Sequence, residues 1–221
     1  FDDNLKVSVN FYQTNQENED NKIIPIVLPK IKYFSGYQNK FGNTSNSTIE
    51  FYNIFREKST IIHAKKQQKF SHKYNIKREI VKFNSKISLD TEIYNQIFNT
   101  ENKLTSGDNY KTGSYYRLFP ILGISTESPF RLKNYKTNLT FKPSFHVVVT
   151  PGISNSNKLS NEDSTNNDFS LNNIYALNRY SGSDKMDNSK RITFGLSAYT
   201  ENFNTNLYQS YEFTNNSNFH R

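Results

Sequence analysis

The chain has 221 residues, of which 34% are hydrophobic, and its mean hydropathy is −0.81. So few apolar residues argue against a large soluble core, and no apolar run approaches the roughly 18 residues that a membrane helix needs. The absence of cysteine excludes disulfides, thiolate metal sites and a cysteine nucleophile from these residues. The formal charge of +8 favours anionic partners, but the basic residues are dispersed among acidic ones, which argues against nucleic acid.

Low hydropathy coexists with an aromatic content of 15%. A membrane β-barrel explains both, because its apolar side chains face lipid while polar side chains fill its interior. Apolar and polar residues alternate along the chain with a period of two, as in strands whose two faces differ. Nine strands are predicted in chain order, at about residues 3–13, 23–35, 46–56, 61–77, 84–98, 114–127, 137–150, 190–201 and 205–214.

The clearest alternation lies in the eighth of these predicted strands. Its apolar residues are separated by small or polar ones, so we expect the two sets to lie on opposite faces. The residues expected to face lipid are Ile192, Phe194, Leu196 and Ala198, and those expected to face the interior are Thr193, Ser197 and Tyr199.

The predicted connections also suggest a barrel. The longest, at about 99–113 and 151–189, fall on the same side when the strands are counted, and shorter links at 77–83, 128–136 and 201–204 fall on the other. Outer-membrane barrels alternate short periplasmic turns with longer extracellular loops in this way.

The sequence therefore predicts an all-β fold, an antiparallel transmembrane β-barrel fragment of about nine long strands from a larger barrel. Residues 1–221 are expected to form a single segment of it. The connection at about 151–189 is expected to be extracellular or folded into the lumen. A soluble β-sandwich of the adhesin type remains an alternative.

Residue types that carry catalysis or bind metals are present without the spacing that either requires. The four histidines form no motif such as H-E-x-x-H, and no G-x-S-x-G elbow marks a serine nucleophile. Glu162 and Asp163 are adjacent carboxylates, but their segment lacks the glycine and the spacing of an EF-hand. We therefore expect no catalytic residue, no metal site and no cofactor, and a protein that is not an enzyme.

Two short motifs stand in the long connection. The first is Asn161-Glu162-Asp163-Ser164, followed by an acidic and aromatic stretch at 168–175. The second is Asn178-Arg179-Tyr180-Ser181-Gly182-Ser183-Asp184-Lys185. Together they resemble the signature of the LptD family of lipopolysaccharide-assembly proteins, with Tyr180 in place of Phe and Lys185 in place of Arg. Segments 24–29, 116–120, 128–130 and 139–143 also resemble family strands, and the likeness is specific over about 115–200.

The LptD resemblance implies a very large barrel in the cell outer membrane that inserts lipopolysaccharide into the outer leaflet without covalent chemistry. It implies an LptE-type plug lipoprotein and an LptA-type periplasmic bridge as partners. Compared with the family, the chain is expected to lack the periplasmic domain, the strands of the lateral gate and the cysteines that some members use for disulfides. Another outer-membrane barrel, a receptor or a hydrolase, is the alternative function.

Within the long connection we expect an ordered structure that folds over or into the barrel, because apolar residues at this density need a surface to pack on. Arg179 and Asp184 are expected to pair across a turn at Gly182, whose missing Cβ permits a positive φ. The apolar residues in question are Phe169, Leu171, Ile174, Tyr175, Leu177 and Tyr180.

Two residues on the strand before this connection are expected to contact substrate. Lys142 and His146 occupy polar positions of the alternating pattern, which places both on the interior face. A lysine and a histidine there would meet anionic groups of a glycolipid.

Overall fold

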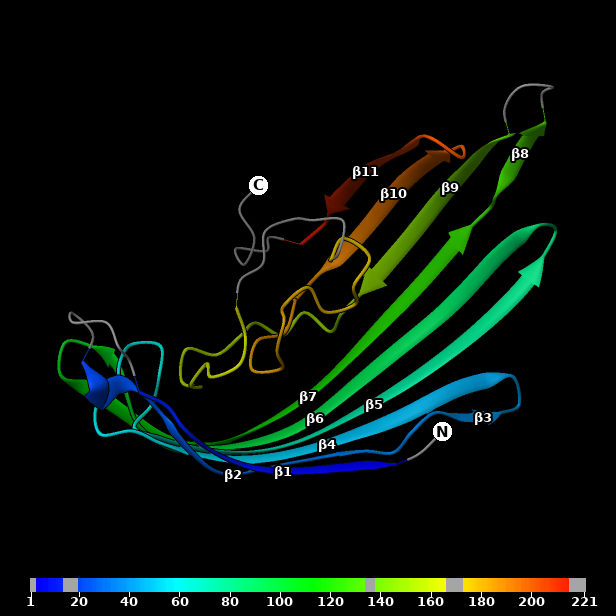
Figure 1. The fold of residues 1–221 in the computed structure, drawn as a ribbon. Coiled ribbons are helices and arrows are strands. Elements are labelled where there is room, and N and C mark those ends of the chain that lie inside the picture. Colours follow the sequence, from blue (N-terminus) through cyan, green and yellow to red (C-terminus); the bar gives the residue numbers. More distant parts are fainter. Residues whose placement is uncertain (1–2, 14–19, 134–137, 166–172, 215–221) are drawn as a thin grey trace.

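The computed structural model describes residues 3–13, 20–133, 138–165 and 173–214. The described strands form one antiparallel sheet in the order β1-β2-β4-β5-β6-β7-β9-β10-β11, and the short strands β3 and β8 pair with β4 and β9 (Figure 1). The strands are β1 (Asn4–Phe11), β2 (Ile26–Phe34), β3 (Gln38–Lys40), β4 (Asn43–Phe55), β5 (Lys66–Lys82), β6 (Ser85–Ser106), β7 (Asn109–Glu127), β8 (Phe130–Lys133), β9 (Asn138–Val149), β10 (Lys190–Tyr199) and β11 (Asn204–Glu212). A 3₁₀ turn, η1 (Asn21–Ile23), precedes β2.

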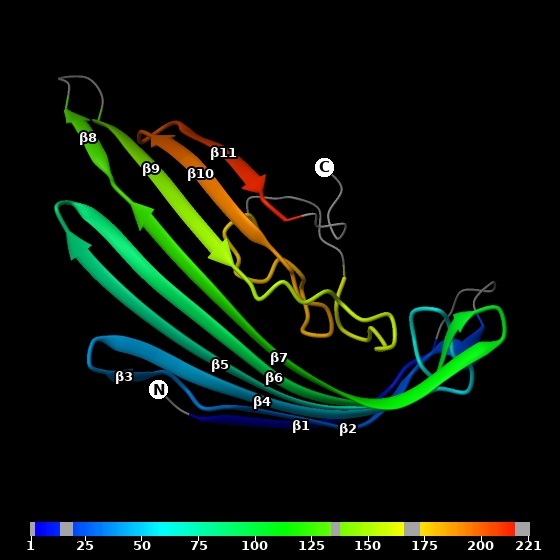
Figure 2. The ribbon, with the colours of Figure 1, turned by 180° about the vertical axis from the view of Figure 1, so that it is seen from behind.

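The nine strands along this path are the nine predicted from sequence, and the all-β antiparallel fold is confirmed. Seen from either side, the sheet bends into an open trough, with β1 and β11 at its two ends (Figures 1 and 2). The described strands form one sheet and not two facing sheets, which removes the β-sandwich alternative for this part of the chain. None of the described helical turns is long and apolar enough to cross a membrane.

Several predicted strand ends were wrong. The predicted long connection at 99–113 is a continuous hairpin, in which β6 and β7 extend to a two-residue turn at Gly107, whose φ is +54°. β5 and β6 likewise continue to a turn at Phe83 and Asn84, where both φ angles are positive as in a type I′ hairpin. Backbone ladder bonds continue through polar residues that carry no alternating signal. Residues 61–65, predicted as strand, belong instead to the connection between β4 and β5.

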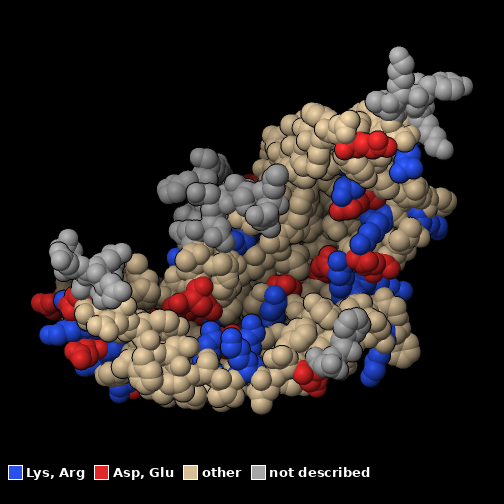
Figure 3. Space-filling view, viewed as in Figure 1, with Lys and Arg blue, Asp and Glu red and all other residues tan. Residues whose placement is uncertain are grey.

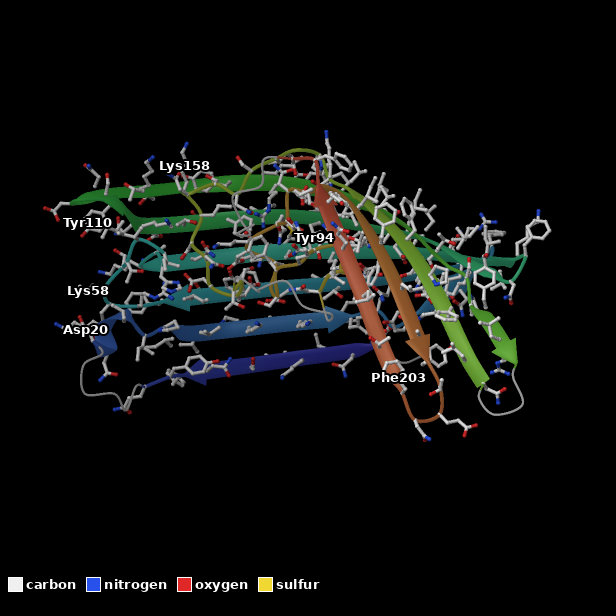
Figure 4. The ribbon with its side chains drawn as sticks, turned by 90° about the horizontal axis from the view of Figure 1, so that it is seen from above. Asp20, Lys58, Tyr94, Tyr110, Lys158 and Phe203 are labelled. Atoms are coloured by element: carbon white, nitrogen blue, oxygen red, sulfur yellow. The ribbon has the colours of Figure 1, made fainter. Side chains whose placement is uncertain are left out.

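The connections do fall on two rims. The turns β3–β4, β5–β6 and β10–β11 gather at one rim, and Phe203 marks this rim in Figure 4. The η1 connection, the β4–β5 connection and the β6–β7 hairpin lie at the opposite rim, where Figure 4 shows Asp20, Lys58 and Tyr110. The predicted sides of the connections are confirmed, but the prediction that both connections at 99–113 and 151–189 are long was wrong for the first, which is a tight hairpin.

The convex face of the sheet is apolar. In β10, Phe194 and Leu196 are 48% and 41% exposed, whereas Thr193 is fully buried on the other face. The strand register places apolar residues next to one another across β4 to β7. Phe51 pairs with Phe70, Phe70 with Ile97, and Ile97 with Tyr116. The predicted separation of Ile192, Phe194, Leu196 and Ala198 from Thr193 and Ser197 agrees with this arrangement.

The concave face is covered in part by the described residues of the connection between β9 and β10, 150–165 and 173–189, which lie inside the trough (Figures 1 and 2). Met186 and Leu177 of this connection pack on Tyr94, Phe119 and Val148 of the sheet. Residues 166–172, which include the predicted packing residues Phe169 and Leu171, lie outside the described part. The described remainder of the connection is folded against the sheet.

Candidate functional site

Asp184 is the centre of the contacts between the connection and the sheet. Its carboxylate accepts a hydrogen bond from Lys69 Nζ of β5 at 2.5 Å and from the Tyr52 hydroxyl of β4 at 3.1 Å. The backbone N–H groups of Glu162 and Asp163 donate to its other oxygen at 2.6 and 3.1 Å. Because the side chains of Lys69 and Asp184 are 0% and 1% exposed, this is a buried ion pair whose hydrogen bonds are supplied by the protein itself.

Asp163 shares the same lysine and brings the two sequence motifs together. Its carboxylate lies 3.1 Å from Lys69 Nζ and accepts from the backbone N–H groups of Ser183 and Asp184 at 3.0 and 2.8 Å. We call Tyr52, Lys69, Asp163 and Asp184 the Asp184 cluster.

Gly182 permits this close approach. A Cβ on Gly182 would overlap the backbone and side-chain oxygens of Asp163, so the glycine is required by space. The expectation that Gly182 supplies a positive φ was wrong, because its backbone is not in the left-handed region. The sequence alone shows that a glycine is present and leaves open whether φ or space requires it.

Glu162 forms a second buried ion pair. Arg56, at the end of β4, donates to both oxygens of its carboxylate at 2.9 and 2.5 Å, and the two side chains are 1% and 4% exposed. Arg56 also donates to the carbonyl of Ala64 at 2.5 Å, which ties the β4–β5 connection to the same point. A bidentate guanidinium fixes direction as well as charge.

Arg179 does not pair with Asp184 as expected. It donates to Asp187 at 2.5 and 3.0 Å and to Glu212 of β11 at 2.9 Å. Arg191 of β10 reaches the same Asp187 at 3.0 Å. The partner of Arg179 is therefore Asp187, a residue just outside the two motifs. Through Glu212 and Arg191, these contacts connect the second motif to β11 and β10.

The remaining motif residues support the local turn. Asn161 and Ser164 exchange side-chain to backbone hydrogen bonds of 2.7 and 3.1 Å. The Asn178 side chain accepts from the backbone N–H of Asp187 at 3.0 Å. Tyr180 is 5% exposed, and burial together with the nearby Asp187 raises its pKa to about 12.

The acidic residues of the connection differ in how their surroundings affect them. Burial acts to raise the pKa of Glu162, but the hydrogen bonds from Arg56, together with His63 at 3.6 Å, outweigh it and lower the pKa to about 2. Burial is likewise outweighed at Asp163, by Lys69 and by the backbone N–H of Asp184, so its pKa also falls to about 2. At Asp184 burial prevails over the attraction of Lys69, and the pKa is raised.

Sequence reasoning missed the partners that the sheet supplies. Lys69 and Arg117 stand at inward positions of β5 and β7, and Arg117 donates to the carbonyls of Asp184 and Ser183 at 2.9 and 2.7 Å. Both residues alternate with outward apolar residues, and this pattern could have indicated from the sequence that they face inward. Which loop carboxylate each basic residue meets depends on contacts across about a hundred residues of chain, such as the separation of 115 between Lys69 and Asp184.

Lys142 and His146 both lie on the concave face of β9. Lys142 Nζ is 3.3 Å from the Glu127 carboxylate. His146 is 3% exposed, and its ring lies 5.7 Å from the ring of Tyr175 in the connection. The two residues are thus in different surroundings, one at a charged surface and one beneath the connection.

The described residues contain no group of three or more His, Cys, Asp or Glu side chains placed to hold a metal ion. The carboxylates of the site are each held by a lysine, an arginine or backbone N–H groups. This arrangement orders a long connection against the inner face of a sheet.

A family model described as LPS transport system D, LptD, matches residues 3–220. The chain belongs to the LptD family. No curated protein sequence matches it significantly. The family membership accounts for the strand-rich sheet with one apolar and one polar face, which is part of an outer-membrane β-barrel of the LptD type.

LptD proteins are an outer-membrane family of transport and assembly proteins and are not an enzyme family. At the level of the family, the chain has a role in lipopolysaccharide transport and assembly and works with other components of that pathway. The predicted resemblance is thereby confirmed over nearly the whole chain, including the residues before 115 where only the topology was similar.

Proposed function

We propose that this chain forms, in the outer membrane, the wall of an LptD barrel that passes lipopolysaccharide into the outer leaflet without covalent chemistry. Residues 1–221 are proposed to act as one barrel segment, with the convex face toward lipid and the concave face toward the lumen. The observation that carries the proposal is the contrast between these faces, since Phe194 and Leu196 are exposed on one and Lys69 and Arg191 are buried on the other. A soluble protein would bury the first pair.

The connection at about 151–189 is proposed to be a lumen segment that shapes the path of the glycolipid. The Asp184 cluster and the Arg56–Glu162 pair support this, because they hold both LptD motifs on the concave face. In this role Asn161, Ser164, Asn178, Arg179, Tyr180 and Gly182 keep the segment folded and touch no reacting group. Lys142, a third exposed beside Glu127, is proposed to meet anionic groups of lipopolysaccharide.

Partners follow from the same role. An LptE-type lipoprotein is proposed to plug the barrel, and an LptA-type bridge is proposed to deliver lipopolysaccharide from the periplasmic side. Both are carried over from the family resemblance.

The test uses the full-length protein in its own cells. Synthesis of the protein is switched off, and newly made lipopolysaccharide is followed by surface labelling and by membrane fractionation. We expect surface labelling to fall and lipopolysaccharide to accumulate in the inner membrane. A matched culture that expresses a plasmid copy should restore delivery. Undiminished labelling after the protein is gone would refute the proposal.

The role of the connection has its own experiment. Deleting residues 165–185 from the plasmid copy is expected to reduce surface lipopolysaccharide, and barrel assembly is measured in the same cells. Unchanged delivery together with unchanged assembly would show that the segment does not shape the path.

A further inference from the structure

Turns at one rim of the sheet carry phenylalanines that lie almost entirely in solvent. Phe41, between β3 and β4, is 94% exposed, and Phe83, between β5 and β6, is 87% exposed. Phe203, in the β10–β11 turn at the same rim (Figure 4), is also more than half exposed. A single exposed apolar side chain needs no explanation, but a ring that recurs at the turns of one rim does.

The backbone at two of these turns does not favour phenylalanine. Phe41 and Phe83 have φ angles of +52° and +51°, and the residue after each also has a positive φ. Both are therefore two-residue turns of type I′, whose first position favours asparagine, aspartate or glycine. A bulky residue at positive φ is strained, so turn formation does not select it. The tight hairpin at the opposite rim has the polar residues Gly107-Asp108 at its tip instead.

Contacts with a neighbouring turn hold the β5–β6 tip in place. The side chain of Asn84 donates to the carbonyl of Pro129 at 2.5 Å, and the hydroxyls of Ser85 and Ser128 lie 2.7 Å apart. The backbone that carries Phe83 is therefore tied to the segment between β7 and β8. The protein holds this ring outward and does not leave it at the end of a free hairpin.

A lysine precedes each of the two strained phenylalanines. Lys40 and Lys82 are exposed, and the Lys82 ammonium lies 5.0 Å from the centre of the ring that follows it. In the described part of the chain, the ion pairs beside the β5–β6 turn use Lys77 and Lys86, which both contact Glu79 at 2.8 Å. Figure 3 shows basic side chains at this rim, at the right of the view, among acidic ones. Each tip thus presents an apolar ring beside a cation that is available to a partner.

The tips continue the apolar convex face of the sheet. Ile80 of β5 stands on the same face as Phe70 by strand alternation, pairs with Ile87 of β6, and the two isoleucines are 47% and 41% exposed. Arg78 and Lys82 flank Ile80 on this face. Basic side chains between apolar ones are typical of the level of membrane headgroups, because their stems lie on apolar surface while their charges reach the phosphates.

The length of the connections indicates which leaflet this rim meets. The β5–β6 and β10–β11 turns at this rim are short, whereas the longer β4–β5 and β9–β10 connections leave from the opposite ends of the strands. Outer-membrane barrels have their short turns on the periplasmic side. The leaflet on that side consists of phospholipid. For this orientation the inference rests on the proposed function, which places lipopolysaccharide in the other leaflet.

We propose that the β3–β4 and β5–β6 turns bind the phospholipid headgroups of the periplasmic leaflet. The rings of Phe41 and Phe83 lie among the headgroups, and the ammonium groups of Lys40 and Lys82 lie against the phosphates. A protein partner would meet a compact patch with an apolar centre. These rings stand instead on successive hairpins along an edge, each with its own cation, which fits an extended layer of lipid.

A first experiment identifies what the tips contact. A photo-crosslinking phenylalanine analogue replaces Phe83 or Phe41 in the full-length protein in its own cells, and mass spectrometry identifies the adduct. We expect a glycerophospholipid adduct at both positions, and none when the analogue replaces Asp108 at the opposite rim. A protein adduct, a lipopolysaccharide adduct or no adduct at the two turns would overturn the inference. Lipopolysaccharide delivery is measured separately, so failure of the inference is distinguishable from failure of the proposed function.

A second experiment separates binding to lipid from formation of the turn. Phe41→Asn places before Gly42 a residue that type I′ turns favour, so the turn itself should not weaken. Full-length wild type and variant, with their native partners, are compared by amide hydrogen exchange of residues 38–46. In phospholipid nanodiscs we expect the variant to exchange at least about tenfold faster, because it loses the burial of a phenylalanine ring.

The control for this variant is the surrounding medium. In an amphipathic polymer that contains no phospholipid, Phe41→Asn should exchange no faster than the wild type. Equal exchange of the two proteins in nanodiscs would overturn the inference. The same acceleration in both media would also overturn it, because the phenylalanine would then stabilise the hairpin without lipid.

Discussion

Lys69 and Asp184 are separated by 115 residues of sequence, and the Lys69 ammonium lies 2.5 Å from the Asp184 carboxylate with both side chains buried. This contact joins the first part of β5 to the second LptD motif. Since the lysine also bonds Asp163 and Ser183, one side chain from the sheet holds both motifs of the connection.

Lys69→Met should release the connection from the sheet. The change leaves two carboxylates without their cation, and breaking a buried ion pair in this way costs about 3–5 kcal/mol. We expect amide hydrogen exchange in residues 160–165 and 182–189 of the full-length protein to accelerate more than about a hundredfold. Lys66→Met is the control, because its pair with Glu101 is 48% and 41% exposed and should contribute at most about 1 kcal/mol. Equal acceleration in both variants would contradict the role given to Lys69.

The Arg56–Glu162 pair should make stability depend on acid pH. The pKa of Glu162 is about 2 in the folded protein against 4.5 for the free side chain, so its stabilising effect is complete above pH 4.5 and is lost as the pH falls toward 2. We therefore expect the wild type to exceed Glu162→Gln in Tm at pH 7, with the difference shrinking between pH 4.5 and 2. A Tm difference that stays constant between pH 4.5 and 2 would show that the Arg56 pair does not lower the pKa of Glu162.

Gly182→Ala should disturb the contact between the motifs. The added methyl group would overlap the backbone and side-chain oxygens of Asp163, whose carboxylate cannot move away without losing the bonds that it accepts from the Ser183 and Asp184 N–H groups. We expect a loss of about 1–3 kcal/mol from overpacking, measured as faster local hydrogen exchange in residues 161–165. Ser181→Ala, one residue away, removes the bond that Ser181 Oγ accepts from the Thr165 N–H, so its effect should be confined to Thr165 and exchange at residues 161–164 should change far less. The prediction fails if both variants behave like the wild type.

Phe194→Arg should destabilise the protein in a lipid bilayer. A charged side chain on the lipid face near the midplane costs about 2–4 kcal/mol. Tyr199→Arg is the matched control, since Tyr199 is on the same strand, toward the concave face, and is 40% exposed. Thr193 cannot serve, because it is fully buried and an arginine would not fit there. The free energy of unfolding of both variants is measured in lipid vesicles. An equal loss in Phe194→Arg and Tyr199→Arg would argue against the orientation of β10.

The sequence by itself determined that the chain forms long antiparallel strands with one apolar face, because alternation is a local property of neighbouring residues. Phe194 and Thr193 fall on opposite faces for that reason alone. The sequence also identified the family, since Asn161 to Ser164 and Asn178 to Lys185 are contiguous motifs. It did not locate the ends of β6 and β7, because ladder bonds continue through polar residues without an alternating pattern.

Only the tertiary structure decided what the motifs contact. Arg179 was expected to meet Asp184, five residues away, but it meets Asp187 and Glu212, while Asp184 meets Lys69. The sequence shows that charged residues of the connection need oppositely charged partners if they are buried, but it does not show which residues these partners are. That choice depends on how the connection folds back over the sheet. The fold brings Tyr52 of β4 and Lys69 of β5 to Asp184, and Arg191 of β10 to Asp187, so that carboxylates which burial would otherwise destabilise are paired.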